Sequence, residues 1–596
     1  MPDQNKQGLF SRLTAILAYR PPKRNTFVLP ELKDEDSYRV TPADREEMDY
    51  GEQEDGRETG EGKGKSKKKP VRAAEWSRVR SDKKESGGRQ DEPAKISPDI
   101  KVSLAVIKRE FHVPQNIDVV IREFKLAGEV DACIVFLDGM ADRNTINDFI
   151  LRQIMSPVPF ANYRGGCRME YIAGSVLAVN QTQKLDQYKD VVLQVLMGVT
   201  AIFIDGCDTC LAVETRGFEK RSIEKPATEA VVRGAQEAFT ENLKTNVTQI
   251  RRIIKNKNLI HETVIVGRGT NSLISILYIR GIANPAAVRE VKRRVKSIET
   301  DMILASGMLE ELIEDSPWMI IPQVLTTERP DRTASHLMEG KVAIINEGSP
   351  FAIVVPVTFH SLLQSPEDYF IRWQYGTLTR LIRTLAFFMA LLLPGLYIAM
   401  TNYHQEMIPT DLLESIARNR EVVPFPTIVE VLMMEISFEL IREAGIRVPG
   451  IIGTTMGIIG ALILGQAAVA ANIVSPILII IVAVTGLGNF AIPNYSLAYG
   501  VRVLRFFFIA MGGVLGFFGI SAGMVMAAAA ALSMKSFGVP FLSPAWPKGT
   551  GPDQIIRYPV WLDEERPDTV NPLNKRKQAE IARGWTRGEP PEGKRE

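Results

Sequence analysis

The sequence has few of the residues that metal sites and nucleophilic enzymes use. Among 596 residues there are 4 cysteines and 5 histidines. Cys207 and Cys210 form a C-x-x-C pair, but no second pair of this kind accompanies it, and a zinc site needs about four ligands. We therefore expect reduced thiols at these positions and no metal site.

The sequence also lacks the common catalytic motifs. It contains no G-x-x-x-x-G-K-[ST], no G-x-G-x-x-G after a predicted strand, no G-x-S-x-G and no H-E-x-x-H. The net charge of +2 is too near neutral to suggest a nucleic-acid binder. We expect a protein that is not an enzyme, uses no cofactor and binds no nucleic acid. Its composition points to membrane lipid as a partner.

Stretches apolar enough to cross a bilayer are confined to one part of the chain. Nearly all long apolar runs lie between residues 385 and 533, and basic residues flank this block on both sides. Because basic residues are enriched in cytoplasmic loops, we expect both termini to be cytoplasmic and the number of spans to be even. The predicted membrane domain covers residues 371–540, with about four spans at 385–401, 450–472, 476–492 and 506–533.

The second predicted span carries no charge and repeats small residues. Gly453, Gly457, Ala461 and Gly465 recur at every fourth position, which places them on one face of a helix. Helices in lipid associate through such faces, because small side chains let two backbones approach closely. Gln466 adds a polar group that is costly in hydrocarbon unless it is paired or faces water. This helix is therefore either a tightly packed span or part of the lining of a water path.

A charged amphipathic helix is predicted at residues 427–443. Its carboxylates Glu435, Glu439 and Glu443 are spaced at i, i+4 and i+8, which aligns them along one stripe. One interpretation is an interfacial helix whose acidic side chains face water or pair with nearby arginines. The other is a re-entrant helix whose carboxylates attract cations toward an ion path. Both interpretations stay open at this point.

The rest of the sequence divides into an α/β region and two tails. Residues 1–96 are highly charged and poor in aromatic side chains, so this tail cannot bury enough apolar surface to fold, and we expect the C-terminal tail at 541–596 to be disordered as well. Between them, helical patterns alternate with short β-branched runs as far as residue 370. We expect α/β subdomains at 97–240 and 241–370, with a long helix over 227–255 at their boundary. The predicted strands are 132–137, 175–179, 200–204, 210–214, 262–266, 273–278, 342–345 and 352–357.

The predicted fold is thus a soluble N-terminal α/β region of two subdomains, followed by an all-α polytopic membrane domain and flanked by disordered N- and C-terminal tails.

A series of motifs runs through the second half of this chain in order. They are TTERPDR (326–332), EGKVAIINEGSPFAIVVPVTF (339–359), SPEDYF (365–370), LPGLYIA (393–399), HQEMIP (404–409), FELIREAGIRVP (438–449), GQAAVAANIVSP (465–476), IPNYSLA (492–498) and SFGVPFLSP (536–544). This series resembles the A subunit of the GerA-type spore germinant receptors. A close relative, the stage V sporulation protein AF group, shares the same architecture and is the alternative.

The resemblance implies a subunit of a larger assembly. Such proteins look like homo-oligomeric, pentameric, nutrient-gated cation channels in the inner membrane of the spore, which work with a permease-like B subunit and a C lipoprotein. On this basis Gly465, Gln466 and Val469 are the expected pore-lining residues, with Val469 as a dewetting constriction and the stripe of carboxylates near an entrance. A non-conducting scaffold or a transporter subunit is the other candidate. No repeat is visible between the two halves of the apolar region, which counts against a transporter.

Overall fold

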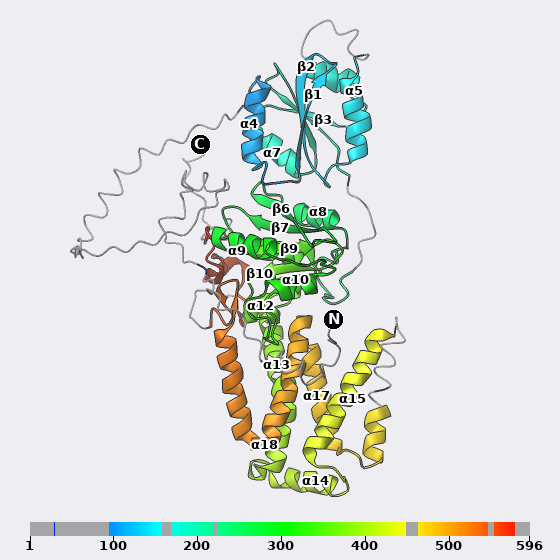
Figure 1. The fold of residues 1–596 in the computed structure, drawn as a ribbon, viewed down its shortest axis with the longest axis vertical. Coiled ribbons are helices and arrows are strands. Elements are labelled where there is room, and N and C mark those ends of the chain that lie inside the picture. Colours follow the sequence, from blue (N-terminus) through cyan, green and yellow to red (C-terminus); the bar gives the residue numbers. More distant parts are fainter. Residues whose placement is uncertain are drawn as a thin grey trace, which may run out of the picture. The chain divides into compact units, whose positions relative to one another are not determined.

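The described part of the protein contains two five-stranded sheets, a short two-stranded sheet and a helical region (Figure 1). The computed structural model describes Leu29 and residues 95–157, 168–179, 181–217, 225–448, 460, 463–545 and 554–578. The first sheet and its helices form one compact unit. The second sheet, the helical region and the C-terminal segment belong to the other unit.

The first α/β unit is a sheet that is covered on both faces. Its strands follow the order β1-β2-β4-β5-β3, and the neighbours pair in antiparallel fashion. Side chains alternate along β2, so Cys133 and Val135 pack against helices α4 and α7, while Ile134 and Phe136 join the core of the opposite face. The elements are α4 (Ile100–Glu110), β1 (Val119–Leu126), β2 (Val130–Leu137), α5 (Arg152–Met155), β3 (Thr182–Leu185), α7 (Tyr188–Leu196), β4 (Thr200–Ile204) and β5 (Cys210–Val213).

The second α/β unit repeats this architecture with the strand order β6-β7-β9-β10-β8. Its central strands β9 and β10 are buried along their whole length, which explains their continuous Val, Ile and Ala composition. The elements are α8 (Leu243–Ile253), β6 (Leu259–Val266), β7 (Ser272–Ile279), α9 (Pro285–Lys296), α10 (Ser306–Ile313), β8 (Leu325–Thr327), α11 (Pro330–Met338), β9 (Val342–Asn346), β10 (Ala352–Val355) and α12 (Phe359–Leu363).

Two predictions for the α/β region were wrong. The strand predicted at 175–179 begins at the end of a π-helical turn, Ile172–Val176, and the next strand, β3, starts only at Thr182. The helix predicted at 227–255 is helical only over Leu243–Ile253. Near the start of the predicted helix, the backbone N–H of Glu229 donates to Glu328 Oε1 at 2.9 Å instead of to a helical carbonyl. Residues 225–240 therefore belong with the second sheet, although the sequence had placed them in the first subdomain.

Among the described residues, the helical region contains the α-helices α13, α14, α15, α17 and α18, and residues 463–470 are helical as well. Helices α13 and α18 are long and apolar enough to cross a membrane, and α17 is a shorter apolar helix. Helix α13 begins well before the predicted span at 385–401, and α15 covers the predicted amphipathic helix and continues to Arg447. The helices are α13 (Trp373–Asn402), α14 (Thr410–Glu421), α15 (Thr427–Arg447), α17 (Pro476–Phe490) and α18 (Tyr495–Ser533).

Helix α18 reverses direction at Gly516, which has φ 59° and ψ −140°. This backbone conformation is available almost only to glycine. A Cβ built on Gly523 would lie 3.1 Å from Cε1 of Phe508, whereas these positions would be about 22 Å apart along one straight helix. The single span predicted at 506–533 is therefore wrong: α18 is a hairpin of two helices, which we call α18a (before Gly516) and α18b (after it).

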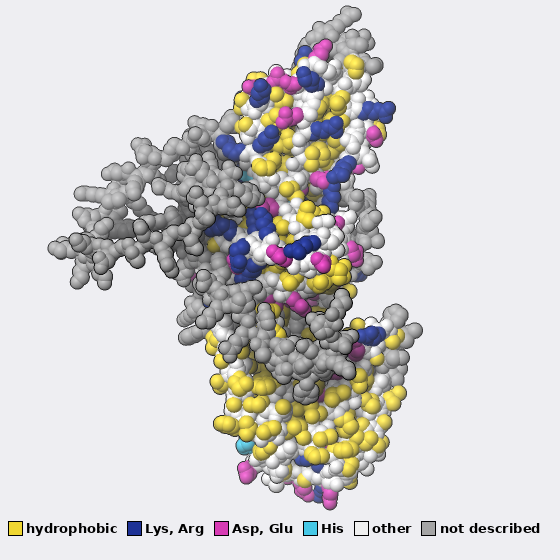
Figure 2. Space-filling model, in the orientation of Figure 1, with side chains coloured by type: hydrophobic (Ala, Val, Ile, Leu, Met, Phe, Trp, Pro, Cys, Tyr) yellow, Lys and Arg dark blue, Asp and Glu magenta, His cyan; other side chains and the backbone are white. Residues whose placement is uncertain are grey.

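The visible surface of the helical region is mainly hydrophobic (Figure 2). Side chains such as Leu487, Phe490 and Val514 are 68%, 66% and 68% exposed. Charged side chains gather instead toward the end that carries α14 (Figure 2). Such a band of exposed apolar side chains is what a lipid-embedded bundle presents to its solvent.

The described residues that follow α18b, 534–545 and 554–578, form a C-terminal segment that packs on the second α/β unit. Ser536 Oγ donates to Gln323 O at 2.7 Å directly after α18b, and Arg566 Nε donates to Met338 O at 2.7 Å further along. The prediction of a disordered tail at 541–596 is thus wrong for residues 554–578. Of the predicted N-terminal tail, only Leu29 and residues 95–96 are described, and Leu29 packs with Ala287 and Val539.

Candidate functional site in the helical region

Helix α15 places its first carboxylate in a fully buried ion pair. Glu435 Oε2 lies 2.6 Å from Nη1 of Arg505 on α18a, and the two side chains are 1% and 3% exposed. A charge taken out of water in this way is tolerated only with a partner at close range. Arg505 also donates its Nε–H to Ala390 O of α13 at 2.8 Å, so one guanidinium joins three helices.

The other carboxylates of the predicted stripe lie in different environments. Glu439 pairs with Arg442 on its own helix and with Arg502 of α18a at 3.3 Å, and its side chain is 29% exposed. The Arg502 guanidinium also lies 3.6 Å from the centroid of the Tyr499 ring. Glu443 is mostly exposed and pairs with Arg447, one turn further along α15. The three carboxylates therefore form a gradient from buried to exposed, and each has an arginine partner.

These contacts also fix the direction of α15. Ile428 packs against Gly513, Glu435 pairs with Arg505 and Glu439 pairs with Arg502, so α15 and α18a run antiparallel. Helices α15 and α17 run parallel. The Ser475 N–H donates to Glu430 at 3.1 Å near the start of both helices, and a Cβ built on Gly486 would lie 2.9 Å from the Phe438 ring further along.

Helices α13 and α18a run parallel and touch through their backbones. The Arg505 side chain donates a hydrogen bond to Ala390 O, and the Tyr403 hydroxyl donates to Gly513 O at 2.7 Å. Between these contacts, a Cβ built on Gly512 would lie 2.6 Å from Gly395 O. Gly395 and Gly512 permit this approach, because a side chain at either of these two positions would collide with the backbone of the other helix.

The predicted pore-lining residues divide between two environments. Gly465 is buried against α17, where a Cβ would lie 3.7 Å from Cδ1 of Ile479, and Val469 packs partly on the apolar core that includes Val474 and Leu478. Gln466 is exposed. The predicted packing residues Gly453, Gly457 and Ala461 lie outside the described residues.

Sequence reasoning missed the arginines that complete this site. Arg502 and Arg505 lie one turn apart in an otherwise apolar stretch, just before the predicted span that begins at residue 506. An ionisable residue inside an apolar helix is itself a signal of function, because its cost in hydrocarbon is retained only for a purpose. That signal was available from the residues alone.

A second cluster of buried charges lies where the second α/β unit continues into α13. The Asp368 carboxylate is fully buried, accepts from Arg380 Nε at 3.0 Å, and accepts from both terminal nitrogens of Arg383 at 2.8 Å. Burial alone would raise the pKa of the Asp368 carboxyl, but the hydrogen bonds and charges of Arg383 and Arg380 outweigh it and hold that pKa below its usual range.

The C-terminal segment closes on the same cluster. The Gln554 carbonyl accepts from Arg380 Nη1 at 3.1 Å, and the Arg557 N–H donates to Thr377 Oγ1 at 3.2 Å. The first turns of α13 are therefore held both by the acid that precedes them and by a segment that follows α18b.

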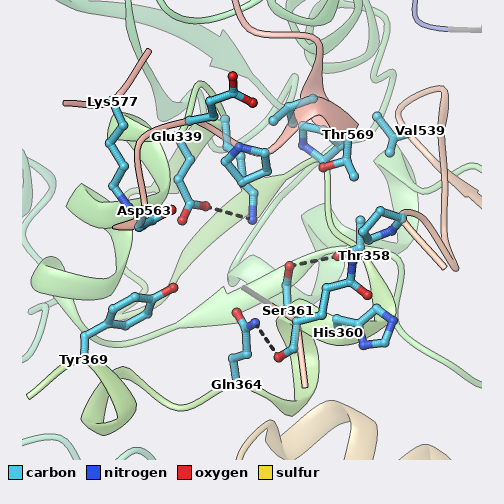
Figure 3. A pocket seen from close by; sticks show the side chains of 17 residues that line it. Glu339, Thr358, His360, Ser361, Gln364, Tyr369, Val539, Asp563, Thr569 and Lys577 are labelled. Atoms are coloured by element: carbon cyan, nitrogen blue, oxygen red, sulfur yellow. Dashed lines mark hydrogen bonds and ion pairs between the residues drawn. The ribbon is translucent and has the colours of Figure 1, made fainter. Parts of the chain in front are cut away.

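A small cavity lies between this C-terminal segment and the second α/β unit (Figure 3). In its wall the hydroxyls of Thr358 and Ser361 are hydrogen-bonded to each other. Nζ of Lys341 lies 3.6 Å from Oε2 of Glu339. Burial would raise the pKa of Glu339, but Lys341 and His336 outweigh it and lower that pKa to about 2. Burial, reinforced by the charge of Lys341, lowers the pKa of His336 to about 4. The charges of these residues are balanced within the cluster.

Comparison with known proteins identifies the family. The model of the Bacillus/Clostridium GerA spore germination protein family matches residues 105–569. The chain belongs to the GerA family. The resemblance seen in the ordered motifs is thereby confirmed.

Several relatives of this GerA-family chain are similar over most of its length. Spore germination protein KA of Bacillus subtilis is 40% identical over 83% of this chain and 91% of its own. Spore germination protein GerLA of Bacillus cereus is 37% identical over 76% and 92%, and spore germination protein A1 of Bacillus subtilis is 36% identical over 78% and 94%. The crystal structure of the N-terminal domain of the A subunit of the Bacillus megaterium spore germinant receptor GerK3 is 31% identical. It covers 44% of this chain and 97% of its own, with a TM-score of 0.36.

Proposed function

We propose that the protein is the A subunit of a spore germinant receptor and that it lies in the inner membrane of the spore. The observation that carries this proposal is the family match over residues 105–569, together with relatives named as spore germination proteins. The exposed apolar surface of the helical region, the length of α13 and the apolar composition of α18 support a place in a membrane. The permease-like B subunit and the C lipoprotein are its proposed partners.

The helix directions support an even number of membrane crossings, which we propose to be six. Helix α13 leaves the second α/β unit, and α15 and α17 run the opposite way to α13 and α18a. Because α15 and α17 run the same way, we count one further crossing between them. The hairpin α18 adds two crossings and ends where Ser536 contacts Gln323. The first helix of the helical region, α13, and the last, α18b, thus both connect to the same α/β unit. In this proposal, α15 crosses the membrane instead of lying on it, and its buried charges are neutralised by α18a.

We further propose that several copies, a pentamer in the simplest case, surround a path for cations. In this proposal Gln466 lines the path. Its exposed polar side chain in an apolar segment supports this role. Val469 and Gly465 would set the width of the path through their packing on α17. Of the carboxylates, Glu443 and Glu439 are the more accessible, so they would supply most of the attraction for cations near an entrance.

The test is cation flux through the assembled complex in liposomes after nutrient addition. We expect flux with the wild type, a changed flux with Gln466→Leu and a leak without nutrient for Val469→Ala. Ser521→Ala, an exposed position on α18b, is the control. Absence of nutrient-triggered flux in a fully assembled wild-type complex would reject the channel.

A non-conducting scaffold is the second candidate, because Glu435, Glu439 and Glu443 all have arginine partners in the structure. A scaffold would support germination with Gln466 and Val469 replaced, provided the complex still assembled. A channel of the stage V sporulation protein AF type would instead conduct without responding to nutrient on its own.

A further inference from the structure

Helix α13 contains a proline that leaves one backbone carbonyl without its usual donor. Pro394 lies inside the helix and is buried. Proline has no N–H, so the carbonyl four residues earlier, that of Ala390, cannot receive the normal helical hydrogen bond. An unpaired carbonyl is costly in any dry environment, and most costly in a membrane.

Arg505 supplies the missing donor from another helix. Its Nε–H donates to Ala390 O at 2.8 Å, and Ala390 is fully buried. The turn that contains Pro394 also lies close to the backbone of α18a, because a Cβ built on Gly395 would lie 2.7 Å from Phe508 O. The proline turn of α13 and the side chain of Arg505 therefore meet at one point.

The charge of Arg505 is balanced from a third helix. Glu435 on α15 pairs with Arg505 through Nη1 at 2.6 Å, whereas Arg505 Nη2 and Glu435 Oε1 have no hydrogen-bond partner among the described residues. An arginine and a carboxylate can form two parallel hydrogen bonds. The pair can thus change from a one-bond to a two-bond arrangement without separating.

We propose that Arg505 is a positioning residue that links the Pro394 turn of α13 to α15. Helix α13 cannot move away from α18a without leaving the Ala390 carbonyl without this donor, and α15 cannot move away from α18a without separating Glu435 from Arg505. Any rearrangement of the bundle that opens a path has to carry these three helices together or break this contact. The structural part of the proposal stands on its own, while its connection to ion release rests on the proposed function.

The test is a double-mutant cycle in the complete receptor complex. Arg505→Lys keeps the charge for Glu435 but cannot also hold the Ala390 carbonyl as the guanidinium does. Pro394→Ala restores an N–H that can donate to that carbonyl. We expect Arg505→Lys to lower the melting temperature of the detergent-solubilised complex, and Pro394→Ala to recover at least half of that loss. Equal losses with and without Pro394 would overturn the proposal.

Arg502→Lys is the matched control, because Arg502 Nε donates to Ala498 O of its own helix and Pro394→Ala should not alter its effect. If Arg505→Lys does not accumulate in membranes, accumulation of the double variant supports the proposal. Failure of the double variant to accumulate, when Pro394→Ala alone accumulates, contradicts it.

Nutrient-triggered cation release is the second readout, and the release rate of the double variant should return to within twofold of the wild-type rate. A wild-type complex that releases no cations rejects the proposed function but leaves the stability cycle decisive for the link.

Discussion

Two clusters of buried charges among the described residues lie where structural elements meet. Asp368 holds the arginines of α13, and Arg505 holds α13 and α15 together. A buried pair stabilises only while both partners are present, because a lone charge keeps its desolvation cost. The exposed pair Glu443–Arg447 differs, since water and salt screen it. Substitutions should therefore have very different effects at carboxylates that look equivalent in the sequence.

Asp368→Asn should destabilise the protein strongly. The change leaves Arg380, whose side chain is 3% exposed, without its counter-charge. Removing one partner of a buried pair typically costs about 3–5 kcal/mol. The melting temperature of the detergent-solubilised chain measures this loss. The neighbouring half-buried carboxylate gives the control, and Glu367→Gln should have a much smaller effect. Equal effects would show that the arginines of α13 do not depend on Asp368.

His336 should make the second α/β unit less stable at acid pH. Its pKa is lowered to about 4 in the folded protein from an ordinary value of 6.5, so between these values the unfolded chain binds the proton and the folded chain does not. Stability should therefore fall as the pH drops from about 6.5 to about 4, by at most about 3 kcal/mol. Unfolding followed against pH should show this slope in wild type and lose most of it in His336→Gln. His112→Gln, in the first α/β unit, should keep the slope, and an unchanged slope in His336→Gln would refute the assignment.

Among the elements, α18 shows how a local backbone feature changes the architecture. Its composition is that of one long apolar helix, and a single span was predicted at 506–533. The structure instead turns the chain back at Gly516, so that Gly523 packs on Phe507 and Phe508. One predicted span thus becomes a pair of helices that pack on each other.

Gly516→Ala should destabilise this hairpin. The positive φ of 59° combined with ψ −140° costs a residue with a Cβ about 1–3 kcal/mol, and the new Cβ would also lie 3.0 Å from Cβ of Tyr403. Limited proteolysis and the melting temperature should both report the change. Gly174→Ala, in a helical turn with open space around it, is the control and should leave both unchanged. An intact melting temperature for Gly516→Ala would mean that the reversal tolerates side chains.

The elements also show what the sequence could and could not predict. Buried strands such as β4 and β9 were predicted closely, since a run of β-branched residues in a covered sheet has few alternatives. Strand β1 was missed because Arg122, Glu123 and Lys125 interrupt its apolar pattern at the exposed positions. In the candidate site the acidic stripe on α15 was visible, but its partners on α18a were not assigned to it, because no periodicity within one helix indicates which distant helix will pack on it.

At the scale of the whole molecule, the direction of α15 separates the proposed topology from the predicted one. If α15 crosses the membrane, its two ends lie on opposite sides. If it is interfacial or re-entrant, they lie on the same side. Arg418 on α14 and Arg447 at the end of α15 are 76% and 78% exposed, so each is a suitable position for a label.

Cysteine labelling in sealed vesicles should therefore distinguish Arg418→Cys from Arg447→Cys in a chain whose four native cysteines have been replaced. We expect a membrane-impermeant thiol reagent to reach only one of the two from outside. Lys575→Cys, in the C-terminal segment, should label together with Arg447→Cys. Labelling of Arg418→Cys and Arg447→Cys from the same side would rule out a crossing by α15.

The C-terminal segment has a consequence for how the protein is made. Arg557 and Arg566 contact residues that are synthesised long before them, at the start of α13 and at the end of α11. The ribosome therefore completes every helix of the helical region before the second α/β unit receives its last contacts. A chain that stopped before Gln554 would leave Arg380 without its hydrogen bond to the Gln554 carbonyl. The contacts that complete this α/β unit are therefore among the last that translation can supply.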